Sequence, residues 1–545
     1  MIGGDVALAV NLPRRCCRPS GAMYRISMSI SRRFSTLSSA VVIACFLSCF
    51  TFASAQSNQK SVKKKAEKPA ASAASSGKKA DAEEKLELPP LPPPAHVEQS
   101  MQLDGNTLHY KVTVGALPVR DQNGKVVGKV VTTAYTVPGK NRPVTFALNG
   151  GPGASSVFLN FGAIGPKHVQ FGNKGDSASE TPTLKDNPGT WLNFTDLVFI
   201  DPVGTGFSRS LVPEAKAKKL FYSTVPDIHY LSRVIYNWLV QNGRMDSRKY
   251  IVGESYGGFR VPRITYYLQS QLGVGMSGEV LISPYLNPTI EDHGDLSPLP
   301  WMVTLPSITA AHLEREGKLT PEAMKAVIDY TMGTYATTLI KGRSDPAATK
   351  AMIAKVTEMT GLNPTFVKQS GGRLETQAYL REVYREEGKI GSVYDSNVTS
   401  FDPFPYAPHQ KANDPILASV IAPLTSAMVN FVTQTVGWKV DAQYNTLSYD
   451  VNRLWVGGDA LRAGSATQLR QAVAADPDLR VLIAHGWDDL SCPFMGSLLT
   501  VDQMPVMGDP TRVAVHEYPG GHMFYTRLDS RLAFRKNVMA MFAKH

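Results

Sequence analysis

The chain has 545 residues, enough for two or three domains with a large core, and its 43% hydrophobic and 19% charged residues are typical of a globular protein. A net charge of +11 would suit a nucleic-acid partner, but residues 1–95 hold 14 basic and six acidic side chains, which leaves +3 for residues 96–545. This distribution excludes a nucleic-acid-binding footprint on the main part of the chain.

The first 55 residues have the pattern of a signal peptide. Arg32-Arg33 precedes an apolar run over 37–52, which ends in Ala53-Ser54-Ala55. We therefore expect cleavage after Ala55 and an exported protein, periplasmic or secreted. No stable membrane span is expected in the mature chain, because the run is short and interrupted by serines. A lipoprotein anchored through Cys45 is the alternative.

Residues 56–95 form a tract rich in Lys, Ala and Ser that ends in a run of prolines. This composition buries too little apolar surface to fold, so the tract is predicted to be a disordered linker. The mature chain then keeps one cysteine, Cys492, which excludes an intramolecular disulfide. Cys492 is expected to be structural, because a better nucleophile is available.

From residue 96 onward, short apolar runs alternate with helical sequence, which predicts an α/β fold with a mostly parallel sheet. The expected strands are 126–137, 144–148, 197–200, 250–252, 279–283, 480–484 and 513–518.

A different pattern occupies residues 288–440. Thr320, Asp345 and Asn363 each precede a proline, as residues at helix N-termini do. We expect a largely helical cap insertion that covers the catalytic end of the sheet; an independent helical domain is the alternative. The predicted core then has two parts, 96–287 and 441–545.

Asn149-Gly150-Gly151-Pro152-Gly153 directly follows the expected strand 144–148. Glycine-rich loops at strand ends bring backbone N–H groups close to an anion. A phosphate loop would continue with Gly-Lys-Ser or Gly-Lys-Thr, which is absent here. An oxyanion-binding loop, similar in kind to the His-Gly-Gly-Gly loops of lipases, fits the sequence better.

Gly253-Glu254-Ser255-Tyr256-Gly257 lies between the expected strand 250–252 and a helix predicted over 259–268, beyond Pro262. Strand, sharp turn and helix are the context in which G-x-S-x-G forms a nucleophile elbow. The pentapeptide also occurs in ordinary turns, so the assignment of Ser255 as a nucleophile depends on a base and an orienting carboxylate.

His522 follows two glycines after the expected strand 513–518, and Asp489 follows the strand 480–484. Together they complete the chain order Ser, Asp, His of α/β-hydrolases. Asp488, His485 and His516 are rival candidates, and the group could also suggest a metal site. No pair has the His-x-x-x-His spacing of a zinc motif.

Four blocks, in this order, resemble the serine carboxypeptidases, a branch of the α/β-hydrolases. They are LNGGPGASS at 148–156, DPVGTGFS at 201–208, GESYGG at 253–258 and Gly521-His522-Met523. The resemblance, which spans roughly residues 100–545, implies a bacterial-type exported serine carboxypeptidase that acts on peptides without a metal or other cofactor.

The resemblance also implies individual roles. Ser255 would be the nucleophile, His522 the base and Asp489, rather than Asp488, the orienting carboxylate, because the family's Asp lies three residues after a glycine, here Gly486. The implied oxyanion hole consists of the N–H groups of Gly151 and Tyr256. The substrate's terminal carboxylate would be held by Asn149, Gly150 and Glu254.

One position departs from the family pattern. The family usually has a glutamate two residues before the Gly-Pro pair that is here Gly165-Pro166, and this chain has Ala163. Glu254 alone would ionise and repel a carboxylate, whereas two carboxyls could share a proton. An esterase or acyltransferase with the same triad is therefore an alternative. A catalytically silent binding protein is a third hypothesis, against which the intact triad argues.

Overall fold

The computed structural model of the protein describes residues 88–170, 178–291, 296–407 and 411–544. The chain divides into two units, residues 1–79 and residues 80–545, and the second contains every element reported below. The expected signal peptide, including Cys45, lies outside the described residues, as does the expected linker up to residue 87.

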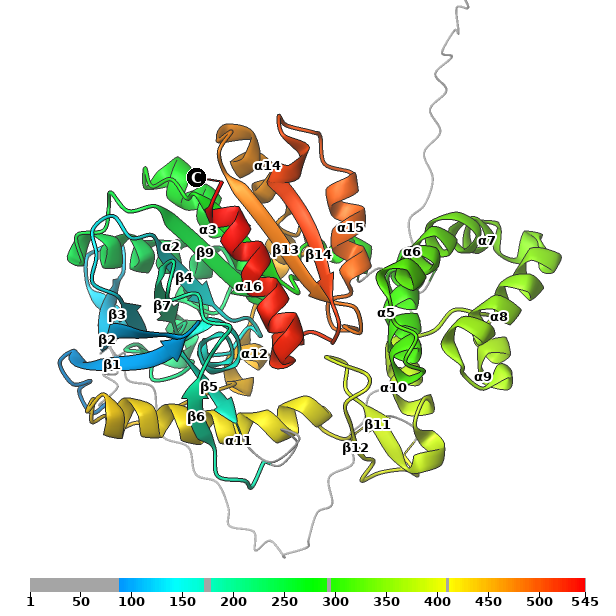
Figure 1. The fold of residues 1–545 in the computed structure, drawn as a ribbon, viewed down its shortest axis with the longest axis horizontal. Helices are drawn as coiled ribbons and strands as arrows, with labels where there is room; N and C mark the ends of the chain where they lie inside the picture. Colours follow the sequence, from blue (N-terminus) through cyan, green and yellow to red (C-terminus); the bar gives the residue numbers. More distant parts are fainter. Residues whose placement is uncertain (1–87, 171–177, 292–295, 408–410, 545) are drawn as a thin grey trace, which may run out of the picture. The chain divides into compact units, whose positions relative to one another are not determined.

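A ten-stranded sheet forms the centre of the second unit (Figure 1). Neighbouring strands are antiparallel from β1 to β7 and parallel from β7 to β14. Every run predicted as a strand is confirmed, whereas the β1–β2 hairpin was not predicted. In spatial order the strands are β1 (Ala95–Leu103), β2 (Asn106–Arg120), β3 (Val126–Thr136), β7 (Asp196–Ile200), β4 (Val144–Leu148), β9 (Lys249–Glu254), β10 (Gly278–Ile282), β13 (Arg480–Gly486) and β14 (Val513–Tyr518), with β8 (Arg209–Ser210) beside β3.

Both faces of the sheet are covered, as its continuous apolar strands require. Along β9, Tyr250 and Val252 join one apolar core and Ile251 joins another on the opposite face. Helices α2, α3 and α14 pack on the Ile251 face, and α11 and α16 pack on the other. Their bounds are α2 (Thr224–Gln241), α3 (Tyr256–Gln271), α14 (Ala466–Ala475), α11 (Pro415–Asn430) and α16 (Leu528–Phe542).

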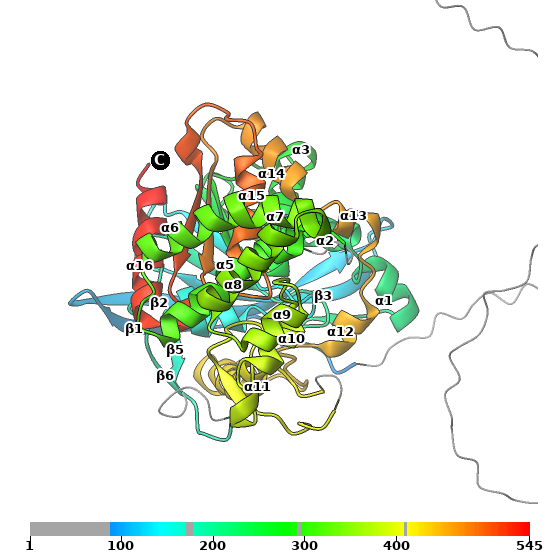
Figure 2. The same ribbon diagram turned by 90° about the vertical axis from the view of Figure 1, so that its right-hand side faces the viewer.

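Between β10 and β13 the chain leaves the sheet and forms a group of helices, here called the cap, which Figure 2 shows facing the viewer. The predicted N-caps are confirmed: the side chains of Thr320, Asp345 and Asn363 accept hydrogen bonds from the first turns that follow. The cap contains α5 (Leu299–Arg315), α6 (Pro321–Tyr330), α7 (Ala336–Lys341), α8 (Pro346–Thr360), α9 (Pro364–Gln369), α10 (Thr376–Glu382) and the hairpin β11 (Lys389–Gly391)–β12 (Thr399–Phe401).

The cap contacts the carboxyl end of the sheet through α5. Ala310 of α5 and Met324 of α6 share a small apolar cluster with Trp487, which follows β13, and with Phe494 of α15 (Phe494–Asp502). This apolar contact fixes the cap beside the loop that follows β13.

Helix α11 lies within the range predicted for the cap but packs against the sheet. Leu424 and Met428 of α11, and Phe431 just beyond it, belong to the same core as Tyr250. The segment that packs apart from the sheet therefore ends before α11, earlier than the predicted boundary at 440. In the described part of the chain, Pro415–Thr435 is the one helix long and apolar enough to cross a membrane, and 33% of its apolar 18-residue window is buried. Length and composition alone are weak evidence for a span.

The remaining elements connect these layers or border the site. They are η1 (Leu159–Ile164), β5 (Lys167–Gln170), β6 (Thr183–Asp186), α1 (Glu214–Leu220), α4 (Pro288–Glu291), η2 (Thr331–Tyr335), η3 (Gly342–Ser344), η4 (Arg385–Glu387), η5 (Phe431–Thr435), α12 (Tyr449–Leu454), α13 (Gly458–Arg462), η6 (Pro510–Arg512) and η7 (Phe524–Thr526).

Candidate active site

Ser255 occupies a strained turn between β9 and α3. Its backbone has φ 60° and ψ −123°, a region that non-glycine residues rarely adopt and that costs on the order of 1–3 kcal/mol. Hydrogen bonds hold this geometry, because the Ser255 N–H donates to Ile282 O at 2.9 Å and its carbonyl accepts from the Tyr285 N–H at 3.2 Å. Helix α3 begins immediately afterwards at Tyr256, earlier than predicted, and contains Pro262.

Close packing explains the glycines around Ser255. A side chain on Gly253 would collide with the carbonyl of Gly257, and one on Gly257 would collide with the carbonyl of Leu148. The turn therefore fits tightly between its own helix and the end of β4. The strand–turn–helix geometry of a nucleophile elbow is present.

His522 and Asp489 lie together in the loops after β14 and β13. The Nδ1 of His522 is 2.8 Å from Oδ2 of Asp489, and both residues are buried. The other oxygen of Asp489, Oδ1, accepts from the N–H groups of Ser491 and Cys492 at 2.8 and 3.0 Å. Burial alone would lower the pKa of His522, but the charge and hydrogen bond of Asp489 outweigh burial and raise it.

Ser255 and His522 do not share a hydrogen bond, although both are described residues. The loops that carry them are nevertheless joined, because Ser283, next to the strand end at Ile282, donates from Oγ to the carbonyl of His522 at 2.9 Å. Catalytic hydrogen bonds are often long without substrate and tighten in the reacting complex.

A short piece of the cap supports both triad loops through its backbone. The carbonyl of Val393 accepts from the Leu490 N–H at 3.1 Å, and the carbonyl of Tyr394 accepts from the His522 N–H at 2.5 Å. Asp414 fixes this piece, because its carboxylate accepts from the Val393 N–H and from the Ser392 hydroxyl. The positions of Asp489 and His522 thus depend on cap residues.

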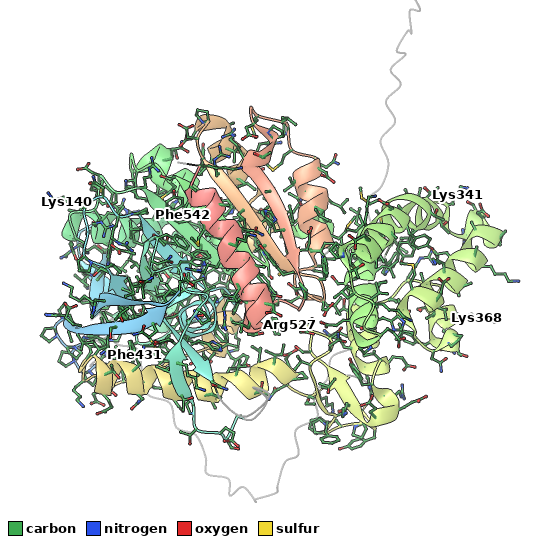
Figure 3. The ribbon with its side chains drawn as sticks, viewed as in Figure 1. Lys140, Lys341, Lys368, Phe431, Arg527 and Phe542 are labelled. Atoms are coloured by element: carbon green, nitrogen blue, oxygen red, sulfur yellow. The ribbon has the colours of Figure 1, made fainter. Side chains whose placement is uncertain are left out.

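Asp488 lies in an acidic cluster with Glu314 and Asp395. Arg527 lies at the start of α16 (Figure 3). It pairs with Glu314 and with Asp395, and lies 3.8 Å from Asp488. Both oxygens of Asp488 are buried without a hydrogen-bond partner among the described residues. Burial, followed by the charges of Asp395 and Glu314, raises the pKa of Asp488 well above its ordinary value.

The glycine-rich loop after β4 lies directly on the elbow. A Cβ atom on Gly150 would lie 2.5 Å from the Tyr256 nitrogen, so only glycine fits there. The N–H groups of Gly151 and Tyr256 donate to no acceptor within the described residues. Two such unpaired donors beside a serine hydroxyl are what a developing oxyanion requires.

Glu254 and Asn149 form a buried polar pair beside these donors. Oε2 of Glu254 accepts from Asn149 Nδ2 at 2.9 Å and from the Tyr525 hydroxyl at 2.7 Å. Burial raises the pKa of Glu254, and the hydrogen bonds of Tyr525 and Asn149 only partly oppose this effect. Sequence reasoning missed Tyr525; its position three residues after His522 is the only signal that could have indicated it.

A buried ion pair supports the position of Asn149. Arg260 of α3 donates from Nε to Asp227 of α2 at 2.7 Å and from NH1 to the Asn149 carbonyl at 2.8 Å. Arg260 and Asp227 are each 1% exposed. The pair therefore fixes the start of the glycine-rich loop from behind.

Ala163 is buried in η1, and its carbonyl accepts from Asn187 Nδ2 at 2.9 Å. Asn160, in the same element, has both amide atoms buried without a partner among the described residues. Neither Ala163 nor Asn160 hydrogen-bonds to Glu254. The side chains that donate to Glu254 are those of Tyr525 and Asn149.

A cavity of about 350 Å³ opens between the cap and the loops around the site. Tyr285, whose N–H holds the Ser255 carbonyl, borders it, as do Leu490 and Ser491 next to Asp489. The cap contributes its other wall, formed by Pro300, Trp301, Val303, Thr304, Leu374, Glu375 and Thr376.

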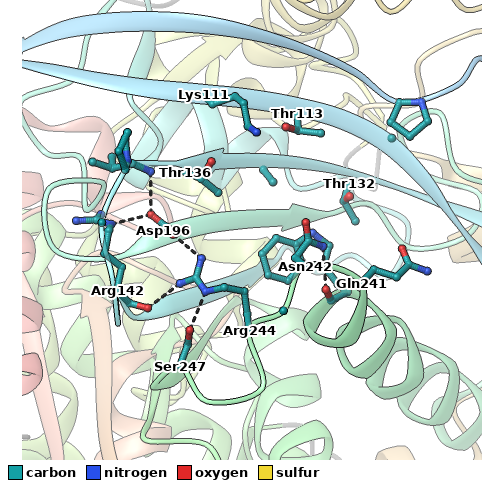
Figure 4. A pocket seen from close by; sticks show the side chains of 18 of the residues that line it. Lys111, Thr113, Thr132, Thr136, Arg142, Asp196, Gln241, Asn242, Arg244 and Ser247 are labelled. Atoms are coloured by element: carbon teal, nitrogen blue, oxygen red, sulfur yellow. Dashed lines mark hydrogen bonds and ion pairs between the residues drawn. The ribbon is translucent and has the colours of Figure 1, made fainter.

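A separate hollow of about 800 Å³ lies at the opposite, amino ends of the parallel strands (Figure 4). Asp196, the first residue of β7, accepts from Arg142 at 2.9 Å and from Arg244 at 2.6 Å. Arg244 also donates to the Arg142 carbonyl. These paired charges join the starts of β4 and β7, which is a structural role distant from Ser255.

The rival residues of the sequence have other environments. His485 is buried with its Nε2 2.8 Å from Ser497 Oγ, and burial lowers its pKa to about 3. His516 lies in β14, and burial lowers its pKa as well. Cys492 is buried. In the described part of the chain, Glu314, Asp395 and Asp488 are the one acidic group close enough for a metal ion, and Arg527 already neutralises part of their charge.

The chain is similar to known serine carboxypeptidases. A family model described as serine carboxypeptidase matches residues 115–523. Serine carboxypeptidase-like 36 of Arabidopsis thaliana is 34% identical over 160 residues, 28% of this chain and 31% of that protein. Carboxypeptidase S1 of Penicillium janthinellum is 34% identical over 140 residues, 25% of this chain and 30% of that protein. The chain thus aligns with about a third of the length of these relatives.

Among solved structures, a prohormone-processing carboxypeptidase from Saccharomyces cerevisiae superposes with a TM-score of 0.51 at 17% identity, over 79% of this chain and 91% of that chain. At this identity the likeness shows the fold. The predicted α/β-hydrolase fold, with its mostly parallel sheet, is therefore confirmed.

Proposed function

Because the chain belongs to the serine carboxypeptidase family, we propose that it is a serine-type carboxypeptidase that releases C-terminal amino acids from peptides through an acyl-enzyme. The observation that carries the proposal is the strained Ser255 beside a buried Asp489–His522 pair, with Asn149 and Glu254 adjacent. Such a site combines a nucleophile, a base and groups able to bind a terminal carboxylate.

In the proposed reaction, Ser255 Oγ attacks the last peptide carbonyl while His522 takes its proton at Nε2. Asp489 holds the imidazole through Nδ1, which fixes the tautomer and stabilises the cation. The N–H groups of Gly151 and Tyr256 donate to the tetrahedral oxyanion. His522 then protonates the leaving amino acid, and water repeats the sequence to release the acyl group. No metal or cofactor has a part in these steps.

The substrate's terminal carboxylate would be bound by Asn149, the Gly150 N–H and Glu254. An ionised Glu254 would repel that carboxylate, whereas a protonated one can donate a hydrogen bond to it. The burial that raises the pKa of Glu254 favours the protonated form in acid. Peptides with a free C-terminus are thus expected to become better substrates as pH falls.

A fluorophosphonate probe tests the serine chemistry. The mature protein should be labelled at Ser255, labelling should vanish in Ser255→Ala, and it should fall sharply in His522→Ala. Removal of a triad member commonly costs on the order of 10⁴-fold or more in turnover. Equal labelling of the three proteins would refute the catalytic assignment, and no labelling of the wild type would favour a silent binding protein.

An esterase or acyltransferase is the second candidate, and Ala163 favours it because Glu254 lacks a second carboxyl with which to share a proton. N-blocked dipeptides, their amides and matching esters separate the two candidates. Hydrolysis of the ester alone would identify an esterase.

We also propose export as a bacterial-type member of the family, periplasmic or secreted, with a signal peptide over 1–55 and a linker over 56–95. The basic, apolar and small-residue pattern before Gln56 supports this proposal. Mass spectrometry of the mature N-terminus checks it: a chain that starts at Gln56 agrees, whereas a lipid-modified Cys45 would establish an anchored lipoprotein.

A further inference from the structure

Two hydrogen-bond donors meet on one oxygen of Glu254. Asn149 Nδ2 lies 2.9 Å and the Tyr525 hydroxyl 2.7 Å from Oε2, while no described residue hydrogen-bonds to Oε1. Glu254 as a whole is 4% exposed. The two oxygens of this carboxyl group therefore have different environments.

This asymmetry determines where a proton on Glu254 resides. An oxygen that already accepts two hydrogen bonds is a poor place for a proton, because the O–H would point at other donors. The proton of the neutral carboxyl group therefore belongs on Oε1. From that atom the carboxyl group can donate a hydrogen bond to a bound anion.

The packing of Tyr525 leaves its hydroxyl little freedom. The residue is 1% exposed, and its ring lies 5.9 Å from the ring of Phe524. A Cβ atom on Gly162 would lie 3.1 Å from the Tyr525 ring, so η1 closes the other side. The phenol adds no charge at neutral pH, because burial raises its pKa well above the ordinary value. His522 and Asp489 are the charged groups that act on Glu254 from neighbouring loops.

We propose that Tyr525 is a positioning residue for recognition of the substrate's C-terminal carboxylate: by donating to Oε2 it directs the proton of Glu254 to Oε1, from which Glu254 donates to the carboxylate. The inference rests on the proposed carboxypeptidase function and deepens it. Tyr525 thereby provides an uncharged hydrogen-bond partner for Glu254 in a chain that has Ala163 where the family usually has a second glutamate.

The test compares Tyr525→Phe with Tyr518→Phe. Tyr518 is also buried, and its hydroxyl contacts Asn537 rather than Glu254, so it is a matched control. The kcat and KM for an N-blocked dipeptide and for its methyl ester are measured from pH 4 to 8. The acid-to-ester ratio is kcat/KM for the dipeptide with a free carboxylate divided by kcat/KM for its ester. At low pH, Tyr525→Phe should lower this ratio about 2–10-fold, the effect of one lost hydrogen bond. The change should lie in the KM of the free-carboxylate dipeptide.

The pH profile adds a readout that a merely structural role would not move. The Tyr525 hydroxyl stabilises the ionised form of Glu254, so its loss should raise the pKa of Glu254. Hydrolysis of the free-carboxylate dipeptide, which declines as pH rises, should then decline at a higher pH. Tyr518→Phe should leave both the ratio and the profile unchanged. Identical ratios at every pH in the wild type and Tyr525→Phe would overturn the inference.

Glu254→Gln provides a second measurement. Because two donors meet at the position of Oε2, the amide oxygen should take that place and the amide nitrogen should take the place of Oε1. The variant should therefore hydrolyse the free acid without the alkaline decline that ionisation of Glu254 causes. If Glu254→Gln failed to hydrolyse the free-carboxylate dipeptide at every pH but still hydrolysed the ester, the inference would be overturned.

Failure of the proposed function would differ from failure of this inference. A wild type that neither reacts with fluorophosphonate nor hydrolyses the ester would refute the serine hydrolase itself. A wild type that reacts at Ser255 and hydrolyses the ester, but shows the same acid-to-ester ratio at every pH, would refute only the role of Tyr525 and Glu254 in recognition.

Discussion

Two adjacent aspartates should respond oppositely to the same substitution. In Asp489→Asn, the Ser491 and Cys492 N–H groups still require an acceptor, so the amide oxygen should remain at Oδ1. The amide nitrogen must then face His522 Nδ1, which can only accept from it. The imidazole proton moves to Nε2, the atom that has to receive the Ser255 proton. We expect kcat/KM to fall about 10⁴-fold, equivalent to about 5.4 kcal/mol.

Asp488→Asn should retain turnover within a few-fold, because Asp488 does not contact His522. It should also stabilise the protein. The pKa of Asp488 is raised in the folded state, so its contribution to stability is present below the unfolded pKa and is lost as pH rises through the folded one. Each pH unit in which only the unfolded chain ionises costs about 1.4 kcal/mol, a cost that asparagine removes.

The assay combines kcat/KM with thermal unfolding of both variants at pH 5 and pH 8. The gain in Tm of Asp488→Asn should be larger at pH 8. The reasoning would be refuted if Asp488→Asn lost as much activity as Asp489→Asn, or if its gain in Tm were no larger at the higher pH.

Three further predictions follow from the site. Gly150→Ala should lower kcat about 10²–10³-fold, as loss of an oxyanion donor does, because the added Cβ would lie 2.5 Å from the Tyr256 nitrogen, one of the two proposed donors. Gly275→Ala is the control, since no atom lies within 4 Å of its added Cβ. Equal kcat values for the two variants would contradict the prediction. Arg260→Leu should destabilise the fold by about 3–5 kcal/mol in urea unfolding, because Asp227 would be left buried without its partner; an unchanged midpoint would argue against this. The acid-to-amide activity ratio should fall as pH rises above 4.5 through the raised pKa of Glu254, and a ratio that is flat across pH would show that Glu254 does not meet the carboxylate.

The sequence predicted the strands and the elbow because their signals are local. A run such as 144–148 is apolar throughout since both faces of its strand are buried, and Ser255 is marked by glycines that close packing requires. The N-caps at Thr320 and Asp345 were likewise predictable, because a capping side chain and its helix are neighbours in the chain.

Contacts between distant segments were not predictable in this way. Tyr525 meets Glu254 across 271 positions, and no periodicity indicates such a pair. The position of α11 was missed because its apolar sequence fits a cap helix and a sheet-packing helix equally well. Asp395 and Glu314 carry no motif at all, although they determine the environment of Asp488.

The hydrogen bonds that the carbonyls of Val393 and Tyr394 accept from the triad loops bear on how this protein family could diversify. A cap that merely covered the site could be exchanged between relatives to alter specificity, or deleted to give a smaller enzyme. Here the same insertion that lines the cavity through Trp301 also holds the backbone of His522. A chimaera that replaces residues 296–391 but keeps 392–398 with Asp414 should therefore acquire new substrate preferences and remain active. A graft that crosses that short piece would lose its base together with its old specificity.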